Sequence, residues 1–330
     1  MRIAFYSTKP YDRIWFAPLA ADYGFEISFI ELPCKKETLG LAQGYDAICI
    51  FVNDYMDKEM IDCLHTMGVK AILLRSAGFN HVDVRAAQGK LEILRVPSYS
   101  PEAVAEFAVT LLLAVNRHIH KAYARTRDFN MSLNGLMGMD LNQKVAGVVG
   151  TGKIGQAMIR ILQGFGMQIL AYDPFPIEGL KVEYVPLEEL FRRSDVISLH
   201  CPLTAETKNL INRESIAMMK EGVYLINTSR GGLIDSDALI EGLLQKKFGG
   251  VGLDVYDEEE GIFYEDCSED IIEDENLARL MTFPNVIITS HMGFFTMEAM
   301  QAIANKTLEN AYALERGLPL VNRVQAVVPV

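Results

Sequence analysis

Short apolar runs rich in β-branched residues alternate with stretches of helical periodicity along the whole chain. In the first hundred residues these runs predict strands at 3–6, 27–30, 47–52, 70–74 and 92–96. A second series predicts strands at 145–149, 168–172, 195–199, 223–227, 250–254 and 286–289. Strands that are apolar on both faces are typical of parallel sheets covered by helices on both sides. The pattern therefore predicts an α/β protein with two series of parallel strands.

The two series meet near residue 100, where a helix is expected to begin. Ser100 can cap the first turn, Pro101 fits its first position, and Glu102 meets the positive end of the helix dipole. The apolar spacing predicts that this helix extends to about Tyr123, and a second long helix is predicted over 297–316. At roughly 150 residues per domain, the 330-residue chain is expected to form two domains.

The surplus of acidic residues lies in one segment. The chain has 43 acidic and 31 basic residues, and the segment 254–275 holds twelve acidic residues and no basic one. A solvated loop is expected there because like charges repel. The segment lacks the spacing of a calcium loop, so we predict no metal site. The isoelectric point near 5.1 argues against nucleic acid or an anionic membrane as a partner.

No apolar stretch approaches the ~20 residues that cross a bilayer. The first residues read as a strand rather than as the apolar core of a signal peptide, so a cytoplasmic protein is expected. The five cysteines include no C-x-x-C pair, so neither a zinc site nor a redox pair is predicted.

A glycine motif, Gly150-x-Gly152-x-x-Gly155, lies between a predicted strand and a predicted helix. In a dinucleotide-binding fold the first glycine permits a tight turn, the second lets the pyrophosphate approach, and the third allows close packing of helix and strand. Asp173 ends the next strand 18 residues later, close to the ~20 expected for the carboxylate that binds the ribose 2′-hydroxyl. A carboxylate repels a 2′-phosphate, and no basic residue follows before Lys181, so NAD is predicted rather than NADP.

Transfer of hydride to a carbonyl needs a proton donor, and the chain has six histidines. His291 follows the last predicted strand, and parallel sheets place their sites at the carboxyl ends of strands. His200 also ends a strand, where it can line the cofactor cleft. The remaining four are interpreted as structural: His65, His81, His118 and His120. His291 is therefore the better acid–base candidate.

Charged residues follow two further predicted strands. Arg230 comes after 223–227, and an arginine can bind a carboxylate through two parallel hydrogen bonds, which suits a keto acid or hydroxy acid. Asp254 ends the strand 250–254, and several glutamates come shortly after it. A carboxylate beside His291 would orient the ring and stabilise its charged form. Each of these residues, taken singly, can also be an ordinary surface charge.

Several motifs together resemble those of the D-isomer-specific 2-hydroxyacid dehydrogenases. They are Asn227–Gly231, Gly252–Tyr256, Ser290–Gly293, Arg75–Asp83 and Val96–Glu106. A narrower resemblance, to the fermentative D-lactate dehydrogenases of this family, rests on Tyr6–Asp12, Phe51–Asp54 and Phe263–Asp266. The resemblance covers the whole chain. It implies a Rossmann doubly wound sheet that binds NAD over 101–296, and a flavodoxin-like substrate domain of residues 1–100 completed by 297–330. It also implies a homo-oligomer, either a dimer or a tetramer.

The resemblance implies catalytic roles for Arg230, Glu259 and His291. Glu259 is chosen over Glu258 and Glu260 by its offset of five residues from Asp254. The implied cofactor contacts are the glycine motif with Lys153 and Ile154, Asp173 at the ribose, Cys201 and Pro202 beside the adenosine half, Thr207, and Thr228, Ser229, Arg230 and Asp254 toward the nicotinamide. The implied substrate contacts are the backbone at Ala77 and Gly78, with Tyr99, Arg230 and His291.

The expected activity is the reduction of pyruvate to D-lactate with NADH, and the reverse reaction with NAD. One alternative is a dehydrogenase of a larger 2-hydroxy acid, branched or aromatic, because Phe294 and Phe295 can close an apolar pocket beside His291. Another alternative is a non-enzymatic NAD-sensing protein of the same fold. The long tails and peptide-docking features expected of such a sensor are missing, which favours an enzyme.

Overall fold

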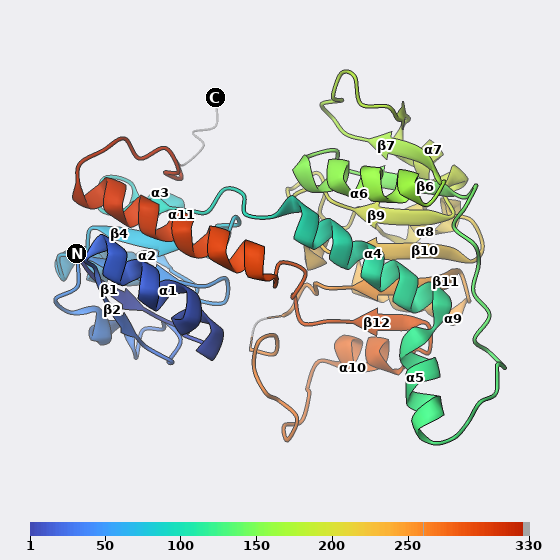
Figure 1. Ribbon diagram of the computed structural model, residues 1–330, viewed down its shortest axis with the longest axis horizontal. Coiled ribbons are helices and arrows are strands. Elements are labelled where there is room, and N and C mark those ends of the chain that lie inside the picture. The colour runs from blue at the N-terminus through green and yellow to red at the C-terminus, as the bar shows by residue number, and fades with distance from the viewer. Residues whose placement is uncertain (260, 326–330) are drawn as a thin grey trace. The chain divides into compact units, whose positions relative to one another are not determined.

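The computed structural model describes residues 1–259 and 261–325. The chain forms two compact units (Figure 1). The first unit comprises Met1–Ser100 with the described residues from Thr296 onward, and the second comprises Pro101–Phe295. Each unit contains one parallel sheet.

The first unit has five parallel strands in the order β2-β1-β3-β4-β5, which is the flavodoxin-like order. The strands are β1 (Arg2–Phe5), β2 (Glu26–Phe29), β3 (Ala47–Ile50), β4 (Ala71–Leu74) and β5 (Glu92–Leu94). The helices are α1 (Pro10–Tyr23), α2 (Lys58–Thr66), α3 (Val84–Ala87) and α11 (Met297–Glu315), with a 3₁₀ turn η1 (Leu39–Ala42). Helices α2 and α3 contribute to the core on one face of the sheet, and α1 packs on the other face, where its Phe16 ring meets Phe5.

Helix α11 belongs to the first unit although it comes last in the sequence. Its Tyr312 ring packs at 5.5 Å from that of Tyr23 in α1, and the Asn310 amide donates to the Arg95 carbonyl oxygen at 2.9 Å. After the helix, the backbone N–H of Val324 donates to the Ile93 carbonyl oxygen at 2.8 Å, beside the edge strand β5.

The second unit has seven parallel strands in the order β12-β11-β10-β9-β6-β7-β8. The strands are β6 (Val145–Val149), β7 (Gln168–Tyr172), β8 (Glu183–Tyr184), β9 (Val196–Leu199), β10 (Val223–Asn227), β11 (Phe248–Leu253) and β12 (Val286–Ile288). Counted from β6, this is the doubly wound Rossmann order with one further strand. The predicted fold class, a Rossmann sheet with a flavodoxin-like second sheet, is confirmed.

Helices cover both faces of the seven-stranded sheet (Figure 1). One face is covered by α4 (Pro101–Arg117) and α6 (Lys153–Gly164). The other is covered by α7 (Leu187–Arg193), α8 (Arg213–Met218), α9 (Ser236–Leu244) and α10 (Glu275–Thr282), with a 3₁₀ turn η2 (Gly231–Leu233). Strands buried on both faces explain the continuous apolar runs, and the loops after the strands are left to carry polar chemistry.

The structure corrects one prediction of local structure and adds one strand that was not predicted. The helix expected to reach Tyr123 ends at Arg117, because His118 adopts the left-handed conformation (φ 51°) and interrupts the helical hydrogen bonds; α5 (Ile119–Arg127) then begins. His118 therefore lies at a helix junction rather than inside one long helix. The edge strand β8 was not predicted, because it has only two residues and neither is buried.

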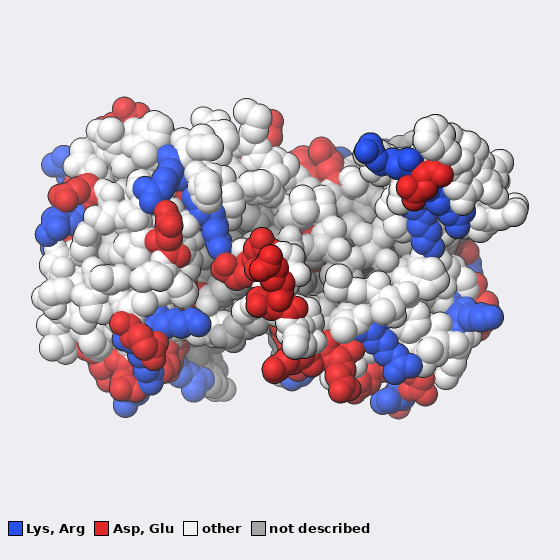
Figure 2. Space-filling view, turned by 90° about the horizontal axis from the view of Figure 1, so that it is seen from below, with Lys and Arg blue, Asp and Glu red and all other residues white. Residues whose placement is uncertain are grey.

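The acidic segment 254–275 is a loop up to the start of α10, and most of its described carboxylates are exposed. On the face seen in Figure 2, acidic side chains gather where this part of the second unit lies, whereas elsewhere both signs of charge are interspersed. The loop is also anchored, because Phe263 is 5% exposed and belongs to the core of the unit. Glu260 lies outside the described residues.

Within the described ranges, no group of histidine, cysteine, aspartate or glutamate side chains is arranged to hold a metal ion. Over the same ranges, no helix has the length and apolar character needed to cross a membrane.

Candidate active site

The candidate residues of the second unit follow the carboxyl ends of six neighbouring strands. In spatial order they are His291 after β12, Asp254 after β11, Arg230 after β10, Cys201 after β9, Gly150 after β6 and Asp173 after β7. Neighbouring strands lie about 4.8 Å apart, so the row extends over about 24 Å. Such a row suits an elongated ligand that lies across the ends of the strands.

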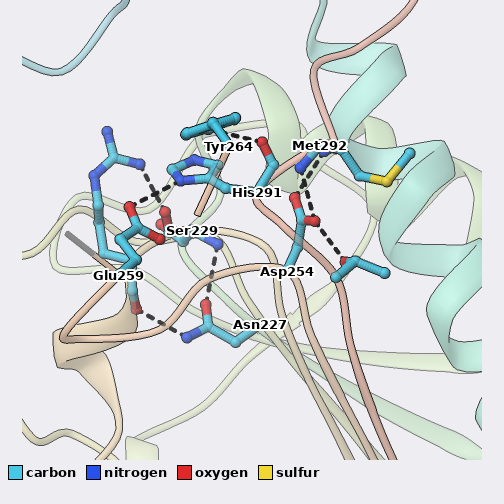
Figure 3. Close-up of polar contacts among 10 residues, drawn as sticks. Asn227, Ser229, Asp254, Glu259, Tyr264, His291 and Met292 are labelled. Carbon is cyan, nitrogen blue, oxygen red and sulfur yellow. Dashed lines mark hydrogen bonds and ion pairs between the residues drawn. The ribbon is translucent and has the colours of Figure 1, made fainter. Parts of the chain in front are cut away.

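At one end of this row, the ring of His291 meets a carboxylate. Its Nδ1 atom lies 3.0 Å from Oε1 of Glu259, and the two side chains are 19% and 22% exposed (Figure 3). The other carboxylate oxygen of Glu259 is buried and has no hydrogen-bond partner among the described residues. The pairing orients the ring and leaves Nε2 as the ring atom for proton transfer.

The main chain of His291 has a left-handed conformation, with φ 55°, which is uncommon for a residue other than glycine. The Asp254 carboxylate holds the turn around it. Its Oδ1 accepts from the Thr289 hydroxyl at 2.6 Å and from the Met292 N–H at 2.9 Å, and its Oδ2 accepts from the Gly293 N–H at 2.7 Å. The Tyr264 hydroxyl donates to the His291 carbonyl oxygen at 2.9 Å.

Asp254 is 1% exposed and lies beneath the turn that it holds. Burial raises the pKa of its carboxyl group, while its three hydrogen bonds and the nearby His291 act in the opposite direction. Both of its oxygens accept hydrogen bonds from the turn after β12, so Asp254 stabilises this turn. Its approach to a nicotinamide stays a prediction.

Arg230 lies in a turn that the preceding asparagine closes. Oδ1 of Asn227 accepts from the Ser229 N–H at 3.0 Å, and its amide nitrogen donates to the Arg230 carbonyl oxygen at 2.8 Å. The Ser229 hydroxyl donates to the Cys201 carbonyl oxygen at 2.7 Å. Arg230 itself donates from Nη1 to the Ser229 carbonyl oxygen at 2.6 Å.

A glycine is required after Arg230 because the turn touches the chain that leads to Glu259. A Cβ atom on Gly231 would lie 2.0 Å from the Tyr256 carbonyl carbon and 2.2 Å from the Asp257 nitrogen. The loops that carry Arg230 and Glu259 therefore pack backbone against backbone.

The glycine motif has the geometry that a bound pyrophosphate needs. Gly150 has φ +93°, and its Cβ would lie 2.6 Å from the Cys201 nitrogen, while a Cβ on Gly155 would lie 2.0 Å from the Gly150 carbonyl oxygen. By contrast, Gly152 caps α6, and no described atom lies within 4 Å of the position of its Cβ. The space in front of this helix start is open and the positive end of its dipole faces it, which fits an anionic cofactor.

A buried hydroxyl group gives a second test of the fit to a cofactor. Thr228 is 7% exposed, and its Oγ1 has no hydrogen-bond partner among the residues that the structure describes. Such a group costs free energy when it is left unpaired. Its position after β10, toward the expected nicotinamide end of the row, fits a ligand that supplies the partner.

Sequence reasoning missed the network that holds Asp173. Oδ2 of Asp173 accepts from the Thr151 N–H at 2.7 Å and from the Thr151 hydroxyl at 3.0 Å, and Oδ1 accepts from the Phe175 N–H at 2.9 Å. The Tyr184 hydroxyl donates to Thr151 Oγ1 at 3.1 Å. Thr151 occupies an unspecified position of the glycine motif, and Tyr184 lies in the unpredicted strand β8, so neither gave a sequence signal.

The loop after β9 carries the remaining cofactor candidates. The Thr207 hydroxyl donates to the Pro202 carbonyl oxygen at 2.7 Å and accepts from the Thr204 N–H at 2.8 Å, which closes this loop on itself. Cys201 is buried, and burial raises the pKa of its thiol to about 11. Lys153 is exposed and Ile154 half-buried in the first turn of α6.

His200 is the weaker acid–base candidate in the structure as well. Burial lowers the pKa of its ring to about 4, so the ring is neutral at pH 7. Its Nε2 lies 2.9 Å from the hydroxyl of Ser198, which is itself buried.

The three candidates of the first unit follow two of its strands. Ala77 and Gly78 come after β4, and their carbonyl oxygens accept from Arg95 at 3.0 Å and from the Ser76 hydroxyl at 2.8 Å. Tyr99 comes after β5 and is half-buried. These bonds fix the loop after β4, and the contacts of all three residues with a substrate stay predictions.

Comparison with known proteins yields one family and several relatives. The family described as D-isomer specific 2-hydroxyacid dehydrogenase, NAD binding domain, matches residues 109–293. The chain is 50% identical to the D-lactate dehydrogenase of Escherichia coli over 321 residues, which cover 96% of this chain and 98% of that protein.

Two solved structures are similar over almost the whole chain. The apo-structure of the D-lactate dehydrogenase from Escherichia coli has a TM-score of 0.90 and 47% identity, covering 98% of this chain and 100% of that one. A structure of the pyruvate reductase of Chlamydomonas reinhardtii has a TM-score of 0.92 and 44% identity, covering 98% of both chains.

The glycine geometry predicts opposite outcomes for two alanine substitutions. Gly152→Ala places a methyl group in open space, so we expect unchanged thermal stability but an affinity for NADH that falls about tenfold or more. Gly155→Ala forces its Cβ onto the Gly150 carbonyl oxygen, so we expect it to lower the free energy of unfolding by about 1–3 kcal/mol. Thermal denaturation and fluorescence titration with NADH measure both. Normal NADH binding by Gly152→Ala would contradict this placement of the pyrophosphate.

Proposed function

The chain belongs to the D-isomer specific 2-hydroxyacid dehydrogenase family, and on this premise we propose that it is a D-lactate dehydrogenase. It would reduce pyruvate to D-lactate with NADH and run the reverse reaction with NAD. The observation that carries the proposal is the pair of His291 and Glu259, 3.0 Å apart, at the end of a row of strand ends that also holds Arg230 and the glycine motif.

NADH, when bound, supplies the hydride that adds to C2 of the keto acid. In the proposed reaction the protonated His291 delivers a proton to the carbonyl oxygen, and in the reverse reaction the neutral ring takes it from the hydroxyl group. Glu259 holds the ring through Nδ1 and stabilises its positive charge. Arg230 polarises the keto acid.

Three residues of the first unit are also proposed to contact the substrate. The backbone at Ala77 and Gly78 stays the proposed site for the substrate carboxylate, with Tyr99 nearby. The D configuration of the product is proposed from the family, since none of the distances above selects it.

A dehydrogenase of a larger 2-keto acid is the second candidate. Phe294 and Phe295, three and four residues after His291, form an edge-to-face pair with ring centroids 6.0 Å apart. Such a pair can close a pocket around a methyl group or around a branched or aromatic side chain. The paired His291 and Glu259 weigh against a protein that only senses NAD, because sensing needs no proton donor.

We also propose that the chain forms a homo-oligomer, a dimer or a tetramer. The support is a part of the second unit made of α5 and residues 128–137, where no described side chain is buried. Large apolar side chains are exposed there, with Phe129 at 88%, Leu133 at 83% and Met137 at 90%. Such patches mark contact surfaces, and a solution mass of one 36.9 kDa chain would contradict the proposal. A cytoplasmic location and a role in fermentation stay predictions.

Substrate preference tests the proposed function. We expect NADH consumption to be fastest with pyruvate among a panel of straight, branched and aromatic 2-keto acids. A faster rate with a branched or aromatic keto acid would favour the second candidate. If no keto acid is turned over, the chain is not a dehydrogenase of this kind.

Cofactor preference depends on the Asp173 carboxylate. Asp173→Ala removes a charge-assisted hydrogen bond to the ribose, worth roughly 1.5–3 kcal/mol, so we expect the affinity for NAD to fall about 10- to 150-fold. Discrimination against NADP should also fall, because the carboxylate no longer repels a 2′-phosphate. Titration of the variant and the wild type with both cofactors measures this. Unchanged affinities for both would show that Asp173 does not bind the ribose.

The pair of Glu259 and His291 sets the pH dependence. Reduction needs the charged ring, so its rate falls as pH rises and the ring loses its proton. Glu259→Gln keeps the shape of the side chain but removes the negative charge that stabilises the charged ring. The alkaline limb of the profile, in which the rate falls as pH rises, should therefore move to lower pH, while activity at still lower pH partly survives. His291→Ala should lose activity by ~10²–10⁴-fold across the range.

Measurement of pyruvate reduction against pH in both variants separates these outcomes. Glu258→Gln is the matched control, because the Glu258 side chain is exposed, and the limb should stay in place. A limb that moves in Glu258→Gln but not in Glu259→Gln would show that another glutamate supports the ring.

A further inference from the structure

Two residues with left-handed backbones contact each other at the candidate site. His291 has φ 55° and Tyr264 has φ 68°, and both are bulky residues that rarely adopt this conformation. Backbone strain of this kind persists only where the surrounding contacts hold it in place, and it concentrates at functional sites. The contacts around His291 therefore indicate which residues keep its ring in position.

The peptide group that joins His291 to Met292 is held on both sides. Its C=O accepts from the Tyr264 hydroxyl at 2.9 Å, and its N–H donates to the Asp254 carboxylate at 2.9 Å (Figure 3). The C=O and the N–H of a trans peptide point in opposite directions from one rigid plane. Two bonds from opposite sides thus fix the rotation of this plane, and with it the direction in which the His291 side chain leaves the main chain.

The two bonds come from different parts of the second unit. Asp254 directly follows β11 and begins the acidic segment, whereas Tyr264 lies ten residues further along it, beside Phe263, which is buried in the core. The same segment carries Glu259, whose carboxylate holds the ring of His291. One loop therefore contacts this histidine through two residues. Glu259 bonds to its ring, and Tyr264 bonds to its backbone and also lies beside the ring, with ring centroids 6.1 Å apart.

We propose that Tyr264 is a positioning residue, whose hydroxyl group fixes the main chain at His291 so that the ring remains bonded to Glu259. The proposal rests on the proposed acid–base role of His291. Without the hydroxyl, the peptide plane loses the bond to its C=O and is held on the side of its N–H by Asp254, so it can rotate and the ring then leaves the carboxylate for part of the time. Two other charged groups of the site are Asp254, beneath the turn, and Arg230, which follows β10.

Tyr264→Phe is the test, because it removes the hydroxyl and keeps the aromatic ring. We expect the turnover rate to fall about 3- to 10-fold, as for the loss of one hydrogen bond, while the affinity for NADH is unchanged. The alkaline limb of pyruvate reduction should move to lower pH, because the charged ring spends less time beside Glu259. A limb that stays in place would overturn the inference.

A tyrosine near the start of the same segment provides the matched control. The Tyr256 hydroxyl donates to Asp274 at 2.9 Å, with no bond to His291. Tyr256→Phe therefore removes one hydroxyl group from the segment and should leave the limb in place. If both variants move the alkaline limb of pyruvate reduction equally, the effect comes from the segment as a whole, and the proposed role of Tyr264 is overturned.

A double variant separates positioning from a merely structural role. If Tyr264 acts through the bonded ring, Tyr264→Phe should produce no further movement of the limb in a Glu259→Gln background. Additive movements would show that the hydroxyl acts by another route and would overturn the inference.

NMR titration of the free protein distinguishes failure of this inference from failure of the proposed function. The ring signal of His291, identified by its loss in His291→Ala, should titrate at lower pH in Tyr264→Phe than in the wild type. This readout needs no substrate, so it holds even if no keto acid is turned over. An identical titration in both proteins would overturn the positioning role.

Discussion

The geometry of the candidate site depends on one buried carboxylate. Asp254 is almost completely enclosed, and its two oxygens accept three hydrogen bonds, all from the turn after β12. A carboxylate buried without hydrogen-bond partners would be strongly destabilising. This turn therefore folds around Asp254, and moving it away would cost the free energy of an unpaired buried charge. The left-handed backbone of His291 lies inside the same turn, and the carboxylate therefore makes a conformation tolerable that the residue would otherwise leave.

The order of the parallel strands brings residues that are far apart in the sequence into one row. His291 and Asp173 are far apart in the sequence, yet the strands that precede them belong to one sheet with four strands between them. Close packing at Gly231 and Gly150 keeps loops that follow different strands against each other, because neither position has room for a Cβ. The sheet supplies the spacing, and the glycines bring the loops close enough for one ligand to touch several of them.

The sequence predicted those parts of the fold that depend on periodic burial. Most strands of both sheets are buried on both faces, so their apolar runs revealed them. The glycine motif was recognisable because each glycine meets a separate steric demand. The break at His118 and the two-residue strand β8 escaped prediction, since one depends on a single backbone angle and the other buries no side chain. The hydroxyl groups of Thr151, Tyr184 and Tyr264 escaped for a related reason. Their partners are atoms that only the folded chain brings near, and the motif Phe263–Asp266, which holds Tyr264, does not show what the hydroxyl group bonds to.

The network around Asp173 has a consequence for how a chain like this one can evolve. The carboxylate that is proposed to bind the ribose also accepts hydrogen bonds from the main-chain N–H groups of Thr151 and Phe175, and the Thr151 hydroxyl accepts from Tyr184. A lineage that exchanged this residue to accept a different dinucleotide would lose those backbone ties in the same mutational step. On the proposed role of Asp173, cofactor choice and local folding are inherited together, and a switch of cofactor requires compensating changes in the loop before or alongside the exchange of this residue.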